Sequence, residues 1–147
     1  MKIIKATLEH ADDVSRLFDL YRQFYECEPD LDLSIRFIKN RLKNNESDIF
    51  IAIDTDKVHG FTQLYPSFCS IAAAKIYILH DLYIDEVSRK SGLGEQLVTT
   101  GLEWARENGA SRIDLLTEYS NKNAQSLYEK LGFQKTLEDF HAYSRNI

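Results

Sequence analysis

The pattern of apolar and polar positions along the chain predicts strands and helices that follow one another in short segments. From Ile76 to Ile84 β-branched and aromatic residues dominate, which is typical of a buried strand. The next segment places apolar residues on one helical face and ends at Asn108-Gly109, a good helix stop. The same patterns predict further strands at residues 2–6, 48–53, 58–65 and 112–117, and further helices at residues 7–25, 35–42 and 122–131.

Two segments carry weaker patterns. Pro66 is expected to end the strand that begins at Val58, and the residues from there to Ala74 are expected to form a loop. From about Gln134 onward one or two closing strands are predicted, and the segment Phe140–Ser144 is the clearer of them.

The order of these elements is β-α-α-β-β-β-α-β-α-β, with one more strand at the end if both closing strands form. A hairpin followed by βαβ units predicts an α/β fold with a mixed sheet and helices on both faces. Gly101 lies inside the long helix, where glycine costs about 1 kcal/mol relative to alanine. It suggests close contact between helix and sheet, with a neutral surface position as the alternative. At 147 residues the simplest organisation is one domain over residues 1–147.

Composition narrows the class of protein. The 44% hydrophobic and 28% charged fractions are those of an ordinary globular domain, and the net charge of −5 argues against a nucleic-acid partner. No apolar run is long enough for a bilayer, and Met1-Lys2 leads directly into strand-like sequence, so a cytoplasmic protein without membrane association is expected. The two cysteines are isolated, and the four histidines show no ligand spacing, so no metal site is predicted.

The turn between the central strand and the long helix has features of an anion-binding loop. Gly92 and Gly94 allow backbone to approach a ligand, and the first N–H groups of the helix favour a phosphate. A plain turn with two glycines is the alternative. A Walker A loop needs a Lys-Ser/Thr pair after its second glycine, where this chain has Glu95-Gln96. A dinucleotide fingerprint needs a small residue where Leu97 stands, so both nucleotide interpretations fail.

The remaining pattern, R-x-x-G-x-G from Arg89 to Gly94, resembles the acetyl-CoA pyrophosphate loop of the GNAT superfamily of N-acetyltransferases. A second stretch, Asn121 to Phe133, is similar to the N-x-x-A-x-x-L-Y-E-K-x-G-F motif of the same superfamily. Phe61–Pro66 and Asp81–Ile84 resemble its bacterial small-molecule branch, which includes polyamine acetyltransferases. The resemblance in order and spacing extends over nearly the whole chain. It implies a three-layer fold with a mostly antiparallel sheet, a splayed parallel pair and helices on both faces.

The resemblance also implies where acetyl-CoA, the acyl donor, would bind. The central strand would separate from the strand at residues 112–117, and the pantetheine arm would lie in the gap. Backbone groups of Leu82 and Ile84 would pair with its amides, and an N–H near Leu82 would stabilise the oxyanion formed on attack. Asn121 would contact pantetheine, and its alternative role as a helix N-cap is compatible with this. The expected donor-binding residues are Leu82, Tyr83, Ile84, Arg89, Lys90, Ser91, Gly92, Leu93, Gly94, Glu95, Asn121 and Ala124.

Two residues are expected to act in catalysis. Tyr128 stands where the superfamily places a phenol that protonates the departing thiolate, a transfer typically worth about 10²–10⁴-fold. Its alternative is a core aromatic on the helical stripe. His80 stands where related polyamine acetyltransferases have a glutamate, and histidine has a suitable intrinsic pKa for a base. A structural histidine is the alternative, and Asp81 and Glu118 are rival bases. Alternation places His80 on the face of Leu82, unless a bulge resets the facing.

The acceptor is expected to be a primary amine of a small molecule, bound near the junction of the first two helices. That segment is acidic and aromatic and would attract a cation, although a solvated acidic loop fits equally well. Polyamines, amino acids, aminoglycoside-like amines and peptide N-termini all remain open as acceptors. A homodimer is compatible with the sequence. The expected acceptor-side residues are Tyr21, Tyr25, Glu28, Asp81 and Glu118.

Two other classes stay open on sequence grounds. The same pocket could serve a non-catalytic acyl-CoA sensor, because a fold does not by itself establish an activity. A phosphate-loop protein of another kind, such as a nucleotide-dependent regulator, is the third class. Turnover of acetyl-CoA would distinguish the enzyme from the acyl-CoA sensor. Thermal shifts with acetyl-CoA, ATP and NAD would distinguish it from the other kind of phosphate-loop protein.

Overall fold

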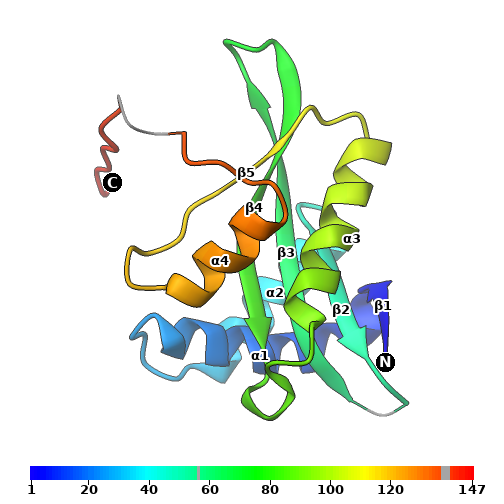
Figure 1. Ribbon diagram of the computed structural model, residues 1–147. Coiled ribbons are helices and arrows are strands. Elements are labelled where there is room, and N and C mark those ends of the chain that lie inside the picture. Colours follow the sequence, from blue (N-terminus) through cyan, green and yellow to red (C-terminus); the bar gives the residue numbers. More distant parts are fainter. Residues whose placement is uncertain (56, 137–139) are drawn as a thin grey trace. The chain divides into compact units, whose positions relative to one another are not determined.

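The computed structural model describes residues 1–55, 57–136 and 140–147, which form two compact units, Met1–Leu116 and Thr117–Ile147. The first unit contains a five-stranded sheet in which the strand order follows the sequence (Figure 1). β1 to β4 pair antiparallel, and β4 and β5 pair in parallel, so the sheet is mixed as expected. The strands are β1 (Lys2–Lys5), β2 (Asp48–Ile53), β3 (Val58–Cys69), β4 (Ala74–Ile84) and β5 (Ile113–Leu115).

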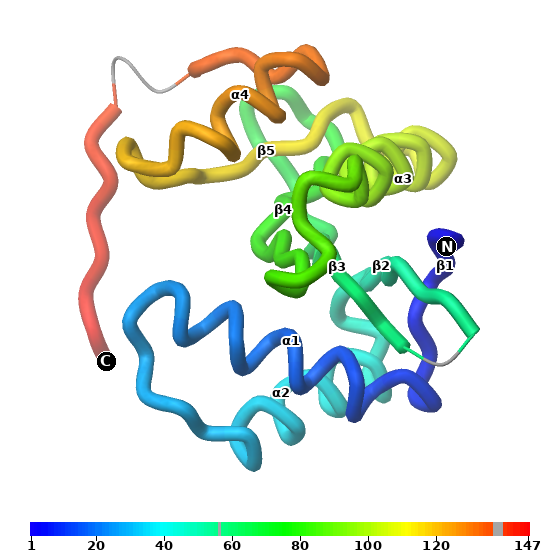
Figure 2. The backbone as a smooth tube through the Cα atoms, turned by 60° about the horizontal axis from the view of Figure 1, so that its bottom comes forward, coloured from blue at the N-terminus to red at the C-terminus, as the bar shows by residue number. Residues whose placement is uncertain are grey.

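Helices of the first unit cover both faces of this sheet (Figure 2). Side chains of β2 alternate between the faces. Ile49 and Ile51 are fully buried in the core with residues of α1 and α2, whereas the Phe50 ring meets Trp104 of α3 at 5.7 Å between centroids. The helices are α1 (Ala11–Phe24), which follows a 3₁₀ turn at Leu8–His10 capped by Thr7, α2 (Leu31–Lys43) and α3 (Leu93–Glu107).

The contact predicted at Gly101 is present. A Cβ atom built on Gly101 would lie 3.3 Å from both Cδ atoms of Leu64 on β3, which is closer than ordinary packing. Glycine therefore allows α3 to approach the sheet closely at this level. The helix ends as predicted, with Asn108 as its last capping residue and Gly109 at φ +79°.

A β-bulge in β4 lies at the centre of the sheet. Gln63 pairs with Asp81 and Leu64 pairs with Leu79, so His80 is an extra residue with no counterpart on β3. A bulge of this kind resets which face the following residues occupy. The bulge therefore determines on which face of the sheet the side chains from Asp81 onward lie. Simple alternation from the start of the strand does not.

β4 and β5 are paired over only a short distance. Tyr77, Ile78 and Leu79 lie opposite the three residues of β5, and β4 then continues to Ile84. Among the described residues, no strand lies beside the second half of β4 on that edge. This is the splayed parallel pair that the resemblance implied.

The prediction for Pro66 was wrong. β3 continues through Pro66 to Cys69 and pairs with β4 along this whole length, so the hairpin is longer than expected. The physical reason is that β2 begins at Asp48, opposite Leu64, so the part of β3 beyond Leu64 has no partner on that side. Proline is tolerated where no second ladder needs its N–H.

The prediction of a strand at Phe140–Ser144 was also wrong, since these residues form no strand in the described structure. Phe140 is 70% exposed and Tyr143 is 92% exposed, so the alternating pattern buries no apolar face there. A strand without burial or a partner has nothing to stabilise it. The earlier part of the predicted closing region includes residues 137–139, which lie outside the described residues.

The second unit contains α4 (Lys122–Lys130), as the sequence predicted. The Asn121 side chain caps this helix by accepting a hydrogen bond from the Ala124 N–H at 3.2 Å. The helix stops before Gly132, which has φ +91°.

Candidate functional site

The N-terminus of α3 carries backbone groups that can bind an anion. Gly92 is its N-cap at φ +81°, no side chain caps the helix, and the first bond of the helical ladder runs from the Gln96 N–H to the Gly92 carbonyl. The N–H groups of Leu93 and Gly94 precede that ladder. A Cβ on Gly92 would meet no heavy atom within 4 Å, so the approach to this end is open. These features fit a pyrophosphate.

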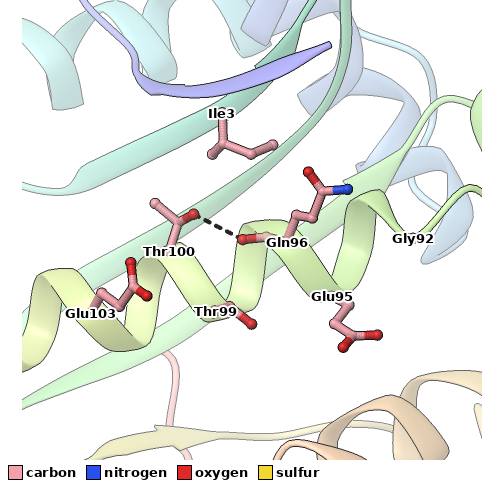
Figure 3. A pocket seen from close by; sticks show the side chains of 7 residues that line it. All are labelled: Ile3, Gly92, Glu95, Gln96, Thr99, Thr100 and Glu103. Carbon is pink, nitrogen blue, oxygen red and sulfur yellow. Dashed lines mark hydrogen bonds between the residues drawn. The ribbon is translucent and has the colours of Figure 1, made fainter.

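A groove of about 500 Å³ lies beside the same helix (Figure 3). Two of its side chains are the carboxylates of Glu95 and Glu103, and the Thr100 hydroxyl is turned back to the Gln96 carbonyl at 2.8 Å. A phosphate would be repelled by these carboxylates. The groove is therefore unsuited to binding a phosphate, whereas the N–H groups at the N-terminus of α3 can bind one. Its lining residues are Ile3, Gly92, Glu95, Gln96, Thr99, Thr100 and Glu103.

The charged residues of the turn are partly engaged by its own backbone. Arg89 donates from Nε to the Ile84 carbonyl at 3.1 Å, and its guanidinium lies over the Tyr83 ring at 5.4 Å. Lys90 is held at φ +60°, a left-handed conformation that is unfavourable for a residue with a side chain. The turn thus has a definite conformation set by contacts with the end of β4.

The unpaired half of β4 presents backbone groups to the gap beside it. The Asp85 N–H donates to the His59 carbonyl at 2.8 Å, which continues the ladder between β3 and β4. In an antiparallel ladder every second residue pair is hydrogen-bonded. The backbone N–H and C=O groups of Asp81 and Tyr83 therefore face β3, whereas those of Leu82 and Ile84 face away from β3. The backbone groups of Leu82 and Ile84 are therefore directed to the edge that β5 leaves uncovered.

A chain of buried polar groups meets at Asp81, directly after the bulge. The Ser47 hydroxyl donates to Gln63 Oε1 at 2.7 Å, which leaves the Gln63 amide to donate from Nε2 to Asp81 Oδ2. The Tyr21 hydroxyl of α1 donates to the His80 carbonyl at 2.9 Å and also interacts with the Asp81 carboxyl. These contacts come from α1, from β3 and from the residue before β2, and they hold the carboxyl in one orientation.

The environment of Asp81 changes its proton affinity. Burial raises the pKa of Asp81 to about 6, and the hydrogen bonds from Gln63 and Tyr21 limit the rise. Asp81 is only 5% exposed. A carboxyl with a pKa of about 6 is mostly ionised at neutral pH and can still take up a proton, which suits a general base.

His80 occupies a different environment from Asp81. It is exposed, and its ring meets Tyr65 of β3 edge-on at 5.0 Å between centroids. Burial raises the pKa of Tyr65 to about 12, and the negative charge of Asp81 adds to this effect. Tyr65 therefore keeps its proton at neutral pH. The first unit thus brings Tyr21, Tyr65, His80 and Asp81 together on the face of the sheet that packs against α1.

The aromatic and acidic segment between α1 and α2 is held by Asp19. Its carboxylate accepts hydrogen bonds from the Asp30 N–H at 3.0 Å and the Ser34 hydroxyl at 2.8 Å. Although burial raises the pKa of Asp19, these hydrogen bonds lower it overall. Tyr25 contacts the Tyr21 ring at 5.1 Å, and Glu28 is exposed.

The second unit carries the remaining predicted residues. The Tyr128 ring packs on Phe133 at 5.7 Å between centroids, and the side chain is 8% exposed. Asn121 and Ala124 are joined by the cap of α4, and the Glu118 carbonyl accepts from the Gln125 side chain at 2.9 Å.

Three residues of the Asp81 environment were not predicted, namely Ser47, Gln63 and Tyr65. A signal was available for one of them, because Thr62 and Gln63 interrupt an otherwise apolar strand pattern. Both are fully buried, and a buried polar pair needs hydrogen-bond partners. Which partners they find depends on the register of β3 against β4.

Comparisons with known proteins identify the family and agree with the fold. Residues 14–133 match the model of the acetyltransferase (GNAT) family. The uncharacterised N-acetyltransferase YhfO of Bacillus subtilis is 40% identical over 147 residues, which is 100% of this chain and 98% of that protein. A crystal structure of a probable acetyltransferase superposes with a TM-score of 0.91 at 36% identity and covers 100% of this chain and 98% of its own. A probable acetyltransferase of Haemophilus influenzae is 28% identical and covers 91% of this chain and 90% of its own.

The fold, the family match and these relatives therefore define a transferase of the GNAT type. The chain belongs to the acetyltransferase (GNAT) family, and its relatives identify it as an N-acetyltransferase.

Proposed function

We propose that this N-acetyltransferase transfers an acetyl group from acetyl-CoA to a primary amine of a small molecule. The observation that carries the proposal is the Asp81 carboxyl, buried directly after the bulge of β4 with a pKa of about 6. It lies one residue before the backbone groups that point to the uncovered edge of the strand. A base and an uncovered row of backbone donors and acceptors thus occur together.

The donor is proposed to bind along β4 and the turn that follows it. Leu82 and Ile84 offer backbone hydrogen bonds to the pantetheine arm, and the first N–H groups of α3 offer them to the pyrophosphate. Bound acetyl-CoA supplies a thioester carbonyl for the amine to attack. An N–H near Leu82 would stabilise the oxygen of that carbonyl as it gains negative charge. The proposed contacts of the turn and of α4 involve Tyr83, Arg89, Lys90, Ser91, the backbone N–H of Glu95, Asn121 and Ala124.

Asp81 is proposed to remove the proton from the amine. A primary amine has a pKa near 10 and is mostly protonated at neutral pH. Only the neutral amine has the lone pair that forms the new bond to carbon, so the ammonium first releases one proton to solvent. The nitrogen becomes much more acidic once it is bonded to carbon, and a carboxylate with a pKa of about 6 can take its next proton at that stage. His80 remains the competing base, and Glu118 is a further rival.

The acceptor is proposed to enter beside the α1–α2 junction. Tyr21 touches both His80 and Asp81 through its hydroxyl, and Tyr25 extends this aromatic surface away from the base. Glu28 lies in the acidic segment that follows, where negative charge attracts an ammonium group. The exposed aromatic rings can also contact a cation directly.

A panel of acceptors tests the proposed function. Purified protein is incubated with acetyl-CoA and polyamines, amino acids, aminoglycosides or short peptides, and release of coenzyme A is measured. Turnover with at least one small amine and none with peptides is expected. Turnover confined to peptides would overturn the small-molecule proposal, and binding of acetyl-CoA without turnover would favour a sensor.

We also expect a cytoplasmic protein and a homodimer, which fractionation and light scattering would check. No described helix is long and apolar enough to span a membrane.

Tyr128 is proposed to give its proton to the departing thiolate. Tyr128→Phe keeps the ring that packs on Phe133 and removes only the hydroxyl. We expect kcat to fall about tenfold or more, with little change in the acetyl-CoA KM, because the proton is needed only as the thiolate leaves. An unchanged kcat under conditions where chemistry limits the rate would leave Tyr128 with a packing role.

A further inference from the structure

A separate cluster of side chains lies between the β2–β3 hairpin and the turn before α3. The His59 Nε2 atom is 2.6 Å from Asp54 Oδ2, and its Nδ1 atom is 2.8 Å from the Ser88 hydroxyl. Both nitrogens of this imidazole are therefore engaged. His59 is near the start of β3, and Ser88 is the last residue of the 3₁₀ turn Glu86–Ser88. Neither residue belongs to the site described above.

The chemistry of the three side chains sets the direction of both hydrogen bonds. An ionised Asp54 carboxylate can only accept, so His59 donates from Nε2. The Nδ1 atom of a neutral imidazole then accepts, and the Ser88 hydroxyl must donate to it. Asp54 thereby fixes the tautomer that allows His59 to hold Ser88.

Backbone and ionic contacts reinforce this attachment. The Asp85 N–H donates to the His59 carbonyl at 2.8 Å, and the Ser88 N–H donates to the Asp85 carbonyl at 2.8 Å. The Asp85 carboxylate lies 3.3 Å from both Arg16 and Lys57. His59 and Asp85 thus attach the turn to the beginning of β3 from two sides.

The turn needs such attachment because its conformation is unfavourable. Lys90 has φ +60° and Gly92 has φ +81°, so two of the residues before α3 are left-handed. A non-glycine residue in that region persists only when surrounding contacts determine it. Ser88 lies just before these residues, and its carbonyl accepts a hydrogen bond from the Ser91 hydroxyl.

We propose that His59, oriented by Asp54, is a positioning residue for donor binding. It holds Ser88, and through Ser88 it keeps the Arg89–Gly94 segment in the conformation that presents the α3 N–H groups to the pyrophosphate of acetyl-CoA. This inference rests on the proposed function, because it assumes that acetyl-CoA binds at this turn.

The test compares His59→Phe, Ser88→Ala and the double variant. Phenylalanine keeps a planar ring and removes both nitrogens, and Ser88→Ala removes only the hydroxyl, so it carries the test if His59→Phe does not fold. Acetyl-CoA affinity is measured by titration calorimetry, and steady-state kinetics give kcat and both KM values. We expect each single variant to weaken acetyl-CoA binding about fivefold to tenfold. The double variant should be no weaker than the worse single one, and kcat and the amine KM should stay within twofold.

Matched variants separate positioning from general destabilisation. Asp54→Asn keeps an acceptor oxygen for Nε2 and should bind acetyl-CoA as the wild type does, whereas Asp54→Leu should resemble His59→Phe. His10→Phe alters a histidine of the turn before α1 and should leave the acetyl-CoA affinity unchanged. Wild-type affinity in Ser88→Ala, or effects that multiply in the double variant, would overturn the inference. Failure of the wild type itself to bind acetyl-CoA would overturn the proposed function first.

Discussion

Replacing Asp81 with asparagine is expected to lower kcat/KM by about 10²-fold or more, because the amide cannot accept the proton of the amine. In the wild type, kcat/KM should rise with pH through an apparent pKa of about 6, since the carboxyl must be ionised to act as a base. Asp81→Asn should lose this rise. A second rise at higher pH would come from deprotonation of the amine. Its apparent pKa should change with the pKa of the acceptor, so acceptors of different basicity identify it. The measurement is the pH dependence of kcat/KM for both proteins.

The same substitution is expected to stabilise the fold. Burial raises the pKa of Asp81 to about 6 from an unperturbed 3.8, so the folded state binds the proton more tightly than the unfolded state. The stabilisation from protonated Asp81 is complete below about pH 4 and is lost as the pH rises to about 6. At pH 8 the ionised carboxylate therefore costs about 2–3 kcal/mol, which asparagine avoids. Urea denaturation of both proteins at pH 4 and pH 8 measures the difference.

His80→Gln is the matched control for the base. The exposed His80 ring contacts Tyr65, and glutamine of similar size should leave the Asp81 environment intact. If Asp81 is the base, the His80→Gln profile keeps its rise near pH 6. If that rise disappears in His80→Gln and persists in Asp81→Asn, His80 is the base and the assignment of Asp81 is wrong. If both variants keep the rise, Glu118 or water is the base.

Replacing Gly94 with leucine is expected to abolish most of the binding of acetyl-CoA. Gly94 is the second residue of α3, and its N–H precedes the helical ladder. A leucine side chain would occupy the approach to these N–H groups and exclude a phosphate from them. We expect the dissociation constant to increase at least about thirtyfold, with loss of the rise in Tm that acetyl-CoA produces by mass action. Calorimetry and thermal denaturation measure the two effects.

Thr99→Leu provides the control for an added apolar side chain on the same helix. Thr99 lines the groove whose carboxylates make it unsuited to a phosphate, so this variant should bind acetyl-CoA as the wild type does. A folded Gly94→Leu protein with normal affinity would show that the helix N-terminus does not hold the pyrophosphate. Gly94→Ala adds only a methyl group and should give an intermediate loss.

Local sequence was sufficient for most of the elements and for the anion-binding turn. Helices were predicted because apolar residues recur on one face, and their ends because Gly109 and Gly132 adopt positive φ where a helix must stop. The two motifs lie within single strand–turn–helix or turn–helix segments, as at Asn121, whose cap is local. Information that is complete within about a dozen residues can be read from the order of the residues.

The length of β3 and the end of the chain could not be read in this way. Whether Pro66 ends a strand depends on whether a second neighbour needs its N–H, and β2, which begins opposite Leu64, does not extend alongside Pro66. Whether Phe140–Ser144 forms a strand depends on a partner and on burial, and the described residues have neither. Both outcomes are set by neighbours distant in sequence.

The environment of the proposed base was decided by tertiary structure alone. Sequence favoured His80 as the base, with Asp81 and Glu118 as rivals. The bulge leaves His80 exposed and aligns Asp81 with Gln63, while α1 brings Tyr21 to the same carboxyl. Register, burial and hydrogen bonds between α1, β3 and β4 then determine the pKa. Sequence thus identifies the family and the turn, whereas the proton affinity at Asp81 exists only once distant segments have packed around it.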